Sequence, residues 1–307
     1  MFLFKKQTDL KQTIGCCLLE NGYSLAIVRD NKQVLYSKAN FFIESELNAI
    51  PEAFASDIDR LDILGQDATF MLVPGQYQLI LMDALDIPET EMNKALRWNL
   101  KGLSDYDLND IVIDACLVPK IEDRPQKTFV AITSLSELKK KLTIFASAFL
   151  NITSATITEM GLKNLLPLMK SHVPAIQDVP IIMISRYDNT SKLHIIYHDL
   201  FYLIREFSAP QTIIEEPDEI THLTLEIYRS IDFCTNQLNL PKPSHLFFTP
   251  DFYHVADVLG AIGQELALTV KLIDLNDYLE IEPPLALKKQ SEVFYAITAA
   301  LVYTEET

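Results

Sequence analysis

Glycine is scarce in this sequence. Only 8 of its 307 residues are glycine, whereas about 7% is usual for globular proteins. Glycine lets a backbone approach a phosphate closely, and it supplies the positive φ angles of tight loops. The chain also has no GxxxxGK[ST] motif. The composition therefore disfavours the common loops that hold nucleotide phosphates.

Cysteine and long apolar runs are sparse as well. The four cysteines form no CxxC pair, so the sequence predicts no disulfide framework and fits a reducing compartment. No uninterrupted apolar run approaches the roughly 18–20 residues that span a bilayer. The first residues, Met1–Lys6, turn polar too soon for a signal peptide. We therefore expect a cytoplasmic protein that reaches a membrane only through a partner.

Positive charge is outweighed by negative charge, with 26 Lys and Arg against 42 Asp and Glu and a net charge of −16. Nucleic-acid binding depends on neutralising phosphates, so this balance disfavours it and leaves room only for a local basic patch. No HExxH or EF-hand spacing occurs. The spacing of His194 and His198 could serve a metal, but no cysteine or carboxylate cluster accompanies them. We expect an ordinary sheet face there and no metal site.

The apolar pattern predicts the same order of elements twice. Two alternating runs joined by Asn21-Gly22 indicate a hairpin, and a third strand, a helix and a strand follow. Three strands within residues 181–207 then precede an amphipathic helix at about 218–238. This duplication predicts an α/β protein with a first lobe at 1–175 and a second lobe at 176–307.

Extra material at about residues 86–152 predicts a small α/β subdomain inserted in the first lobe. Its first helix has an apolar stripe and an opposite basic face, with the only tryptophan at the border. A charged stripe is more often simply solvated, yet a tryptophan beside cations is also typical of a docking site for a partner or anionic lipid. The candidate docking residues of this helix are Lys94, Arg97, Trp98 and Lys101.

Two internal runs resemble the MshI proteins of MSHA-type pilus systems, which are relatives of the PilM proteins of type IV pilus assembly. One begins at Ile87-Pro88-Glu89 and continues through residues 95–101. The other, residues 225–233, has the pattern LE-x-x-RS-[LI]-D-[YF]. Residues 294–301 are similar to the closing helix of the family, with Thr298 where glycine is usual. The resemblance covers nearly the whole chain and implies a duplicated, actin-like (RNase H-like) two-lobe fold whose C-terminal helix packs back on the first lobe.

The resemblance also implies a scaffold on the cytoplasmic face of the inner membrane of a Gram-negative bacterium. PilM-type proteins bind the N-terminal cytoplasmic tail of a single-pass PilN-like protein and take part in the pilus assembly platform. By analogy, the groove for this tail lies between the first-lobe core and the inserted subdomain. Arg229 and Asp232, on the outer side of their helix, are further docking candidates, although a surface ion pair accounts for them equally well.

Active members of the actin-like superfamily hold phosphate and Mg²⁺ on two hairpins that each carry Asp-x-Gly. In this sequence the matching positions, together with those of the adenine-contacting glycines, hold other residues. A glutamate repels phosphate, a leucine side chain blocks close backbone approach, and a proline removes a donor. We therefore expect no catalytic residue and no cofactor. The replaced positions are Cys17, Leu19, Glu20, Ser185, Tyr187, Thr249 and Pro250.

Two other classes of function stay open from the sequence. An active actin-like ATPase of pilus or type II secretion machinery, with ATP and Mg²⁺ as its ligands, predicts stabilisation by Mg-ATP that is abolished by changes at Cys17 or Ser185. A self-assembling filament protein of the actin kind predicts polymers whose light scattering depends on concentration.

Overall fold

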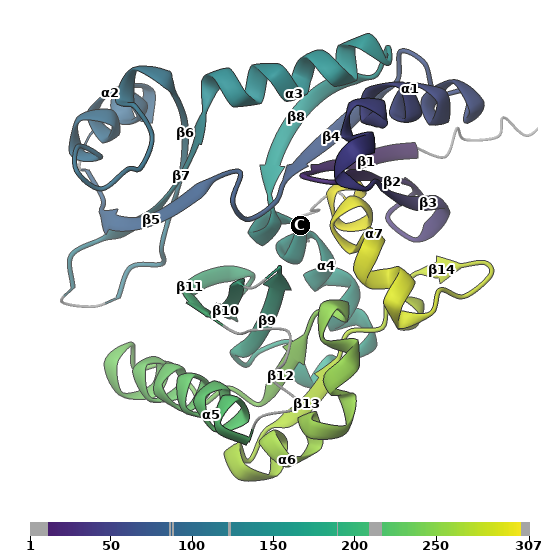
Figure 1. The fold of residues 1–307 in the computed structure, drawn as a ribbon. Coiled ribbons are helices and arrows are strands. Elements are labelled where there is room, and N and C mark those ends of the chain that lie inside the picture. The colour runs from purple at the N-terminus through teal and green to yellow at the C-terminus, as the bar shows by residue number, and fades with distance from the viewer. Residues whose placement is uncertain are drawn as a thin grey trace, which may run out of the picture.

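A computed structural model provides the structure of the chain and describes residues 12–85, 87, 89–121, 124–188, 190–208 and 217–301. Two lobes are each built on a twisted sheet, and a smaller third sheet extends from the first lobe (Figure 1). Pro88, in the run that begins at Ile87, and Asn189, within the predicted strands of residues 181–207, lie outside the described residues. Within the described ranges, no helix is long and apolar enough to cross a membrane.

The first lobe contains a six-stranded sheet of order β14-β3-β2-β1-β4-β8. The meander β1–β2–β3 is antiparallel, and β4 and β8 add in parallel. Helices α1 and α3 cover one face, and α4 and α7 cover the other. The strands are β1 (Gln12–Leu19), β2 (Gly22–Arg29), β3 (Gln33–Phe41), β4 (Asp67–Leu72), β8 (Asn151–Ile157) and β14 (Glu280–Ile281), and the helices are α1 (Ile50–Arg60), α3 (Leu135–Ser147), α4 (Thr158–His172) and α7 (Leu287–Ala300).

The predicted first hairpin is confirmed, but its turn is shifted by one residue. Gly22 pairs with Leu19 as the first residue of β2, so Glu20 and Asn21 form the turn. Gly22 does not have a positive φ. The absence of a side chain at Gly22 instead allows β2 to lie close to β3, because a Cβ there would lie 2.0 Å from the carbonyl oxygen of Asn40.

The second lobe repeats the plan of the first with a five-stranded sheet of order β11-β10-β9-β12-β13. The predicted amphipathic helix is α5, whose apolar side packs with α6 on the sheet through Leu223, Ile227 and Ile231. The elements are β9 (Ile181–Tyr187), β10 (Thr190–Tyr197), β11 (Leu200–Ser208), α5 (Pro217–Asp232), β12 (His245–Phe248), α6 (Ala256–Leu266) and β13 (Thr269–Leu272).

Helix α7 returns the end of the chain to the first lobe and packs against β1 and β2 (Figure 1). The helix backbone lies directly on Gly15, where a Cβ would meet the carbonyl oxygen of Ala296 at 2.1 Å. Thr13 Oγ1 donates to the carbonyl of Ala300 at 2.6 Å. Thr298, at the position where the MshI resemblance expects glycine, is accommodated because its neighbour on α4 is Gly161.

The inserted subdomain is a three-stranded antiparallel sheet of order β5-β7-β6, with α2 packed on one face. Its bounds differ from the expected 86–152. The strand β5 precedes that range, while α3 and β8 belong to the first lobe, since Phe145 of α3 packs against Phe54 and Phe70 there. The elements are β5 (Gln78–Asp83), α2 (Glu89–Asn99), β6 (Ile111–Leu117) and β7 (Lys127–Ser134).

Short helical turns connect these elements. They are η1 (Glu44–Ala49), η2 (Leu108–Asp110), η3 (Pro174–Ile176), the π-helical η4 (Phe233–Gln237), η5 (Pro250–Val255) and η6 (Leu275–Asp277).

Candidate functional site

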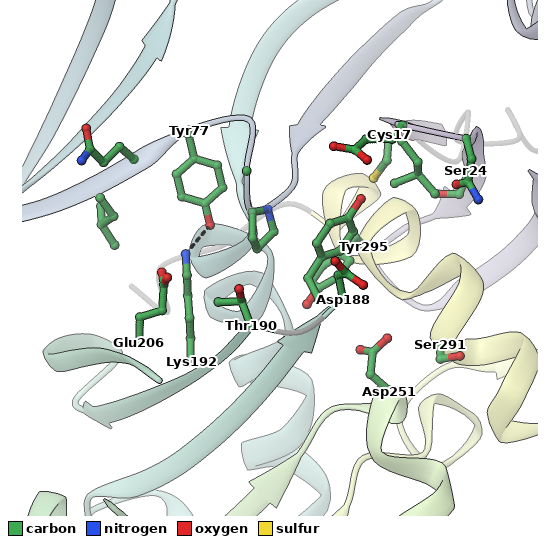
Figure 2. Close-up of a pocket in the computed structure, with 18 of the residues that line it drawn as sticks. Cys17, Ser24, Tyr77, Asp188, Thr190, Lys192, Glu206, Asp251, Ser291 and Tyr295 are labelled. Atoms are coloured by element: carbon green, nitrogen blue, oxygen red, sulfur yellow. Dashed lines mark hydrogen bonds between the residues drawn. The ribbon is translucent and has the colours of Figure 1, made fainter. Parts of the chain in front are cut away.

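A large hollow lies between the lobes, and we call it the inter-lobe cleft. It has a volume of about 1040 Å³. One wall comes from the β1–β2 hairpin and the connection from β4 to β5, and the opposite wall comes from the β9–β10 hairpin and Asp251, with α7 contributing Ser291 and Tyr295 (Figure 2). The two hairpins of the duplicated fold therefore face the same space.

Half of the described residues that line the cleft are acidic or aromatic. Six carboxylates line it, and Lys192 is the only cation among the described lining residues. Coulomb repulsion from such a wall opposes the entry of a triphosphate. The carboxylates are Glu20, Asp105, Asp188, Glu206, Asp251 and Glu292.

Lys192 belongs to a buried network that joins the lobes beneath the cleft. Its ammonium donates to Glu159 Oε1 at 2.8 Å and to Tyr77 Oη at 3.0 Å. Figure 2 shows the bond to Tyr77. The Tyr77 hydroxyl in turn donates to Glu159 Oε2 at 2.6 Å. Glu159 is fully buried, and although burial favours its neutral form, the Lys192 ammonium lowers the pKa of its carboxyl. The cation of the cleft is therefore already engaged in an internal ion pair.

Two ionisable groups near this network are held neutral by burial. His194, on the same strand as Lys192, is fully buried, and burial lowers its pKa to about 4. The Cys17 thiol is also fully buried, which raises its pKa to about 12. A neutral thiol is a poor nucleophile and a poor metal ligand, so Cys17 acts as a small core residue.

Asp251 stands at the second-lobe side of the cleft. Burial raises the pKa of its carboxyl to about 7, even though the nearby Arg186 guanidinium opposes the shift. Arg186 donates to the backbone carbonyl of Asp251 and lies over the ring of Phe252 at 4.7 Å. The Oδ2 atom of Asp251 is buried and has no hydrogen-bond partner within the described part of the chain.

The raised pKa of Asp251 predicts a pH-dependent effect of the isosteric change Asp251→Asn. The folded state binds the Asp251 proton up to about pH 7, while an unfolded aspartate loses it near pH 4. The contribution of Asp251 to stability is therefore lost as pH rises between these values. Because asparagine does not ionise, we expect the variant to gain stability relative to the wild type from pH 5 to pH 8. Urea unfolding across this range measures the difference, and a constant difference would contradict the prediction.

A second hollow, the apolar groove, lies between the open face of the subdomain sheet and the first lobe, and Phe201 and Ile204 of β11 in the second lobe also line it. It has a volume of about 170 Å³. Leu79, Phe129 and Ala131 line it from the subdomain, while Ala155 of β8 and Met160 of α4 line it from the first lobe. Strands β8 and β6 are the outer strands of their sheets, so each offers a strand edge beside the groove. Such a groove suits an extended peptide with apolar side chains.

Comparison with known proteins gives a clear result at the level of structure. No protein-family model and no curated protein sequence matches this chain. PilM, in the structure of the PilM–PilN type IV pilus biogenesis complex, has 13% identity and a TM-score of 0.70, with 94% of this chain and 97% of that chain covered. A Bacteroides thetaiotaomicron protein described as having an actin-like ATPase fold and unknown function has 13% identity and a TM-score of 0.53, with 91% and 96% covered. The chain has an actin-like ATPase fold.

The cytoplasmic domain of EpsL is a further similar structure. It is an inner-membrane component of the type II secretion system of Vibrio cholerae, and its identity to this chain is 10% with a TM-score of 0.50. The alignment covers 92% of this chain and 94% of that domain. The expected fold class, a duplicated actin-like fold with an inserted subdomain, is confirmed by these similarities.

Within this actin-like fold, the positions that the resemblance matches to nucleotide-binding residues fall in two groups. Cys17, Leu19, Glu20 and Tyr187 all line the inter-lobe cleft. Ser185, Thr249 and Pro250 do not line it: Ser185 and Thr249 are buried, and Pro250 opens η5 beside Asp251.

The α2 helix carries the predicted docking candidates, but the structure gives Arg97 another role. Its guanidinium donates to the carbonyls of Leu108 and Ile111, and this ties the helix to the loop before β6. Lys94, Trp98 and Lys101 are exposed, with Trp98 at 76%. The expected continuous basic face is therefore reduced to two lysines, because Arg97 is engaged internally.

The expected ion pair between Arg229 and Asp232 on α5 does not form. Arg229 pairs with Glu226 at 2.7 Å instead, and Asp232 accepts from Asn236 at 2.6 Å. Both side chains are exposed and lie on α5, away from the groove lining. They stay candidates for a separate contact surface.

Sequence reasoning did not find the network of Tyr77, Glu159 and Lys192, nor Asp251. Each is an isolated polar residue near apolar neighbours in the sequence. The partners lie between 33 and 115 positions apart, and no short motif connects them. The one available signal is that Lys192 and Glu159 lie within segments predicted to form regular structure, where a lysine and a glutamate are rarely buried unpaired.

Proposed function

We propose that this chain is a PilM-like scaffold of a type IV pilus assembly platform, and specifically the MshI-like component of an MSHA-like system. It works on the cytoplasmic face of the inner membrane of a Gram-negative bacterium. It reaches the membrane by holding the N-terminal tail of a PilN-like single-pass protein, and it contacts other platform components there.

The apolar groove is the observation that carries this proposal. It lies where a partner tail can enter between the first lobe and the inserted subdomain, and the fold around it is similar to PilM from a PilM–PilN complex. The groove has apolar walls and two outer strands whose backbone groups can pair with an added strand. These features suit a peptide tail better than a small polar substrate.

We also propose that the protein is a pseudo-ATPase. Leu19, Glu20 and Tyr187 stand in the cleft wall at positions where active relatives of this fold hold phosphate. A carboxylate and bulky side chains oppose phosphate binding there by charge and by volume. Mg-ATP therefore serves as the negative control in the experiment that follows.

A groove variant, Ala155→Glu, tests the proposal. Ala155 is exposed on β8 and lines the groove, so the change places a carboxylate against a bound apolar tail without disturbing the core. Desolvating this unpaired charge is costly, and we expect at least about tenfold weaker binding, which corresponds to about 1.4 kcal/mol. Calorimetry with a synthetic peptide of the N-terminal tail of the PilN-like protein from the same genome measures the affinity.

The matched control is Ala146→Glu, which makes the same change at an exposed position of α3 outside the groove lining. It should bind the tail as the wild type does. If the wild type shows no binding with or without Mg-ATP, the proposed scaffold role is wrong. If both variants bind equally well, the tail does not use this groove.

A further inference from the structure

The inter-lobe cleft has a charge that nothing in the proposed function explains. Its described lining carries six carboxylates against one ammonium, and that ammonium is engaged with Glu159. Three of the carboxylates have a cation nearby: Lys141 faces Glu20, Arg186 faces Asp251, and Lys289 pairs with Glu292. Within the described residues, Asp105, Asp188 and Glu206 form no ion pair. The cleft therefore keeps a net negative potential, which its low-dielectric walls concentrate.

A second observation concerns Asp251, whose side chain in the cleft has an oxygen without a hydrogen-bond partner within the described ranges. The carboxylate of Asp251 points toward the centre of the hollow (Figure 2). Its buried Oδ2 atom has no hydrogen-bond partner among the described residues. Because Asp251 keeps its proton up to about pH 7, a cationic donor that enters the cleft would satisfy this oxygen and favour the ionised form of the carboxyl.

The cleft and the apolar groove are neighbours. Tyr77 and Leu79 line both hollows and so separate them. We infer that an extended peptide in the groove can reach the cleft by running over the edge of this shared wall. The two hollows offer it different chemistry, because the groove is apolar and the cleft is acidic.

We propose that the inter-lobe cleft receives the basic residues of the same partner tail whose apolar residues occupy the groove, an inference that rests on the proposed function. Cytoplasmic segments next to a membrane span carry an excess of Lys and Arg, which matches the sign of the cleft. Tyr106 and Tyr187 in the lining offer ring faces to such cations. The cleft that holds a nucleotide in active relatives thereby binds the basic residues of a peptide through its carboxylates.

The test uses hexa-arginine peptide as the probe and a triple variant, Glu20→Gln/Asp188→Asn/Glu206→Gln. All three side chains are exposed, so the changes leave the core intact, and asparagine tolerates the positive φ of residue 188. The control variant, Glu52→Gln/Asp59→Asn/Glu265→Gln, removes the same charge from exposed helix positions outside the cleft lining. Calorimetry at low salt measures the affinity of each for hexa-arginine.

We expect the cleft variant to bind hexa-arginine at least about tenfold more weakly than the control variant, with the affinity of the wild type falling as salt rises. Equal losses in both variants would mean that only overall charge attracts the probe, and the inference would be overturned. The tail peptide separates the two proposals. If Ala155→Glu weakens tail binding and the cleft variant does not, the groove proposal stands and the cleft proposal fails. If the wild type does not bind the tail, the scaffold role fails.

Discussion

Replacing Lys192 with methionine is expected to lower the free energy of unfolding by about 3–5 kcal/mol, the usual effect of breaking a buried ion pair. The change leaves the fully buried Glu159 carboxylate without its ammonium partner at 2.8 Å. The hydroxyls of Tyr77 and Thr158 still donate to Glu159, but neutral donors do not replace a charge. Urea unfolding followed by circular dichroism measures the loss.

Two companion variants make this result specific. Lys140→Met removes an exposed pair with Glu137, and we expect it to change stability by no more than about 0.5 kcal/mol. Adding Glu159→Met to Lys192→Met removes the stranded carboxylate, and much of the lost stability should return. A Lys192→Met effect as small as that of Lys140→Met would show that the network does not hold the lobes together.

Gly15→Ala is the second change with a large expected effect, about 3 kcal/mol of destabilisation. The added Cβ would lie 2.1 Å from the carbonyl oxygen of Ala296 and 2.5 Å from the amide nitrogen of Ala300. Both contacts are with helix backbone, which cannot rotate away as a side chain can. Helix α7 must therefore lift from β1, and the hydrogen bond from Thr13 to Ala300 is lost with it.

The matched control is Gly260→Ala on α6, where an added Cβ meets no heavy atom within 4 Å. An alanine in a helix is favoured over glycine by about 1 kcal/mol, so this variant should be slightly more stable than the wild type. Thermal unfolding of the two variants side by side measures the contrast. Similar behaviour of both would refute the close packing of α7 on β1.

Local patterns in the sequence predicted much of the fold. Cys16 and Cys17 lie on opposite faces of β1, as strand alternation requires, and they belong to different core clusters. The sequence Ser134-x-x-Glu137 has the capping-box pattern, and Ser134 caps α3 by accepting from the amide of Glu137 at 3.2 Å. These features can be predicted from the sequence because the residues that interact are only a few positions apart.

The features that sequence reasoning missed depend on distant partners. The role of Arg97 is set by the carbonyls of Leu108 and Ile111. Every residue has a backbone carbonyl, so the pattern of side chains does not show which carbonyls a guanidinium contacts. The subdomain boundary was misplaced because the helical pattern of α3 is the same whichever sheet it covers. The acidity of the cleft arises from residues contributed by six separate segments, so no window of sequence shows it.

The course of the chain through the first lobe has a consequence for its synthesis. The sheet that begins with β1 is completed at its edge by β14, and one of its faces is covered by α7. A ribosome makes both of these elements after the other elements of the second lobe, so the nascent first lobe lacks an edge strand and one of the helices over that face until the second lobe has been made. Exposed apolar surface on such an incomplete lobe is prone to aggregation. Helix α7 therefore completes the first lobe only after the strands of the second lobe have been synthesised.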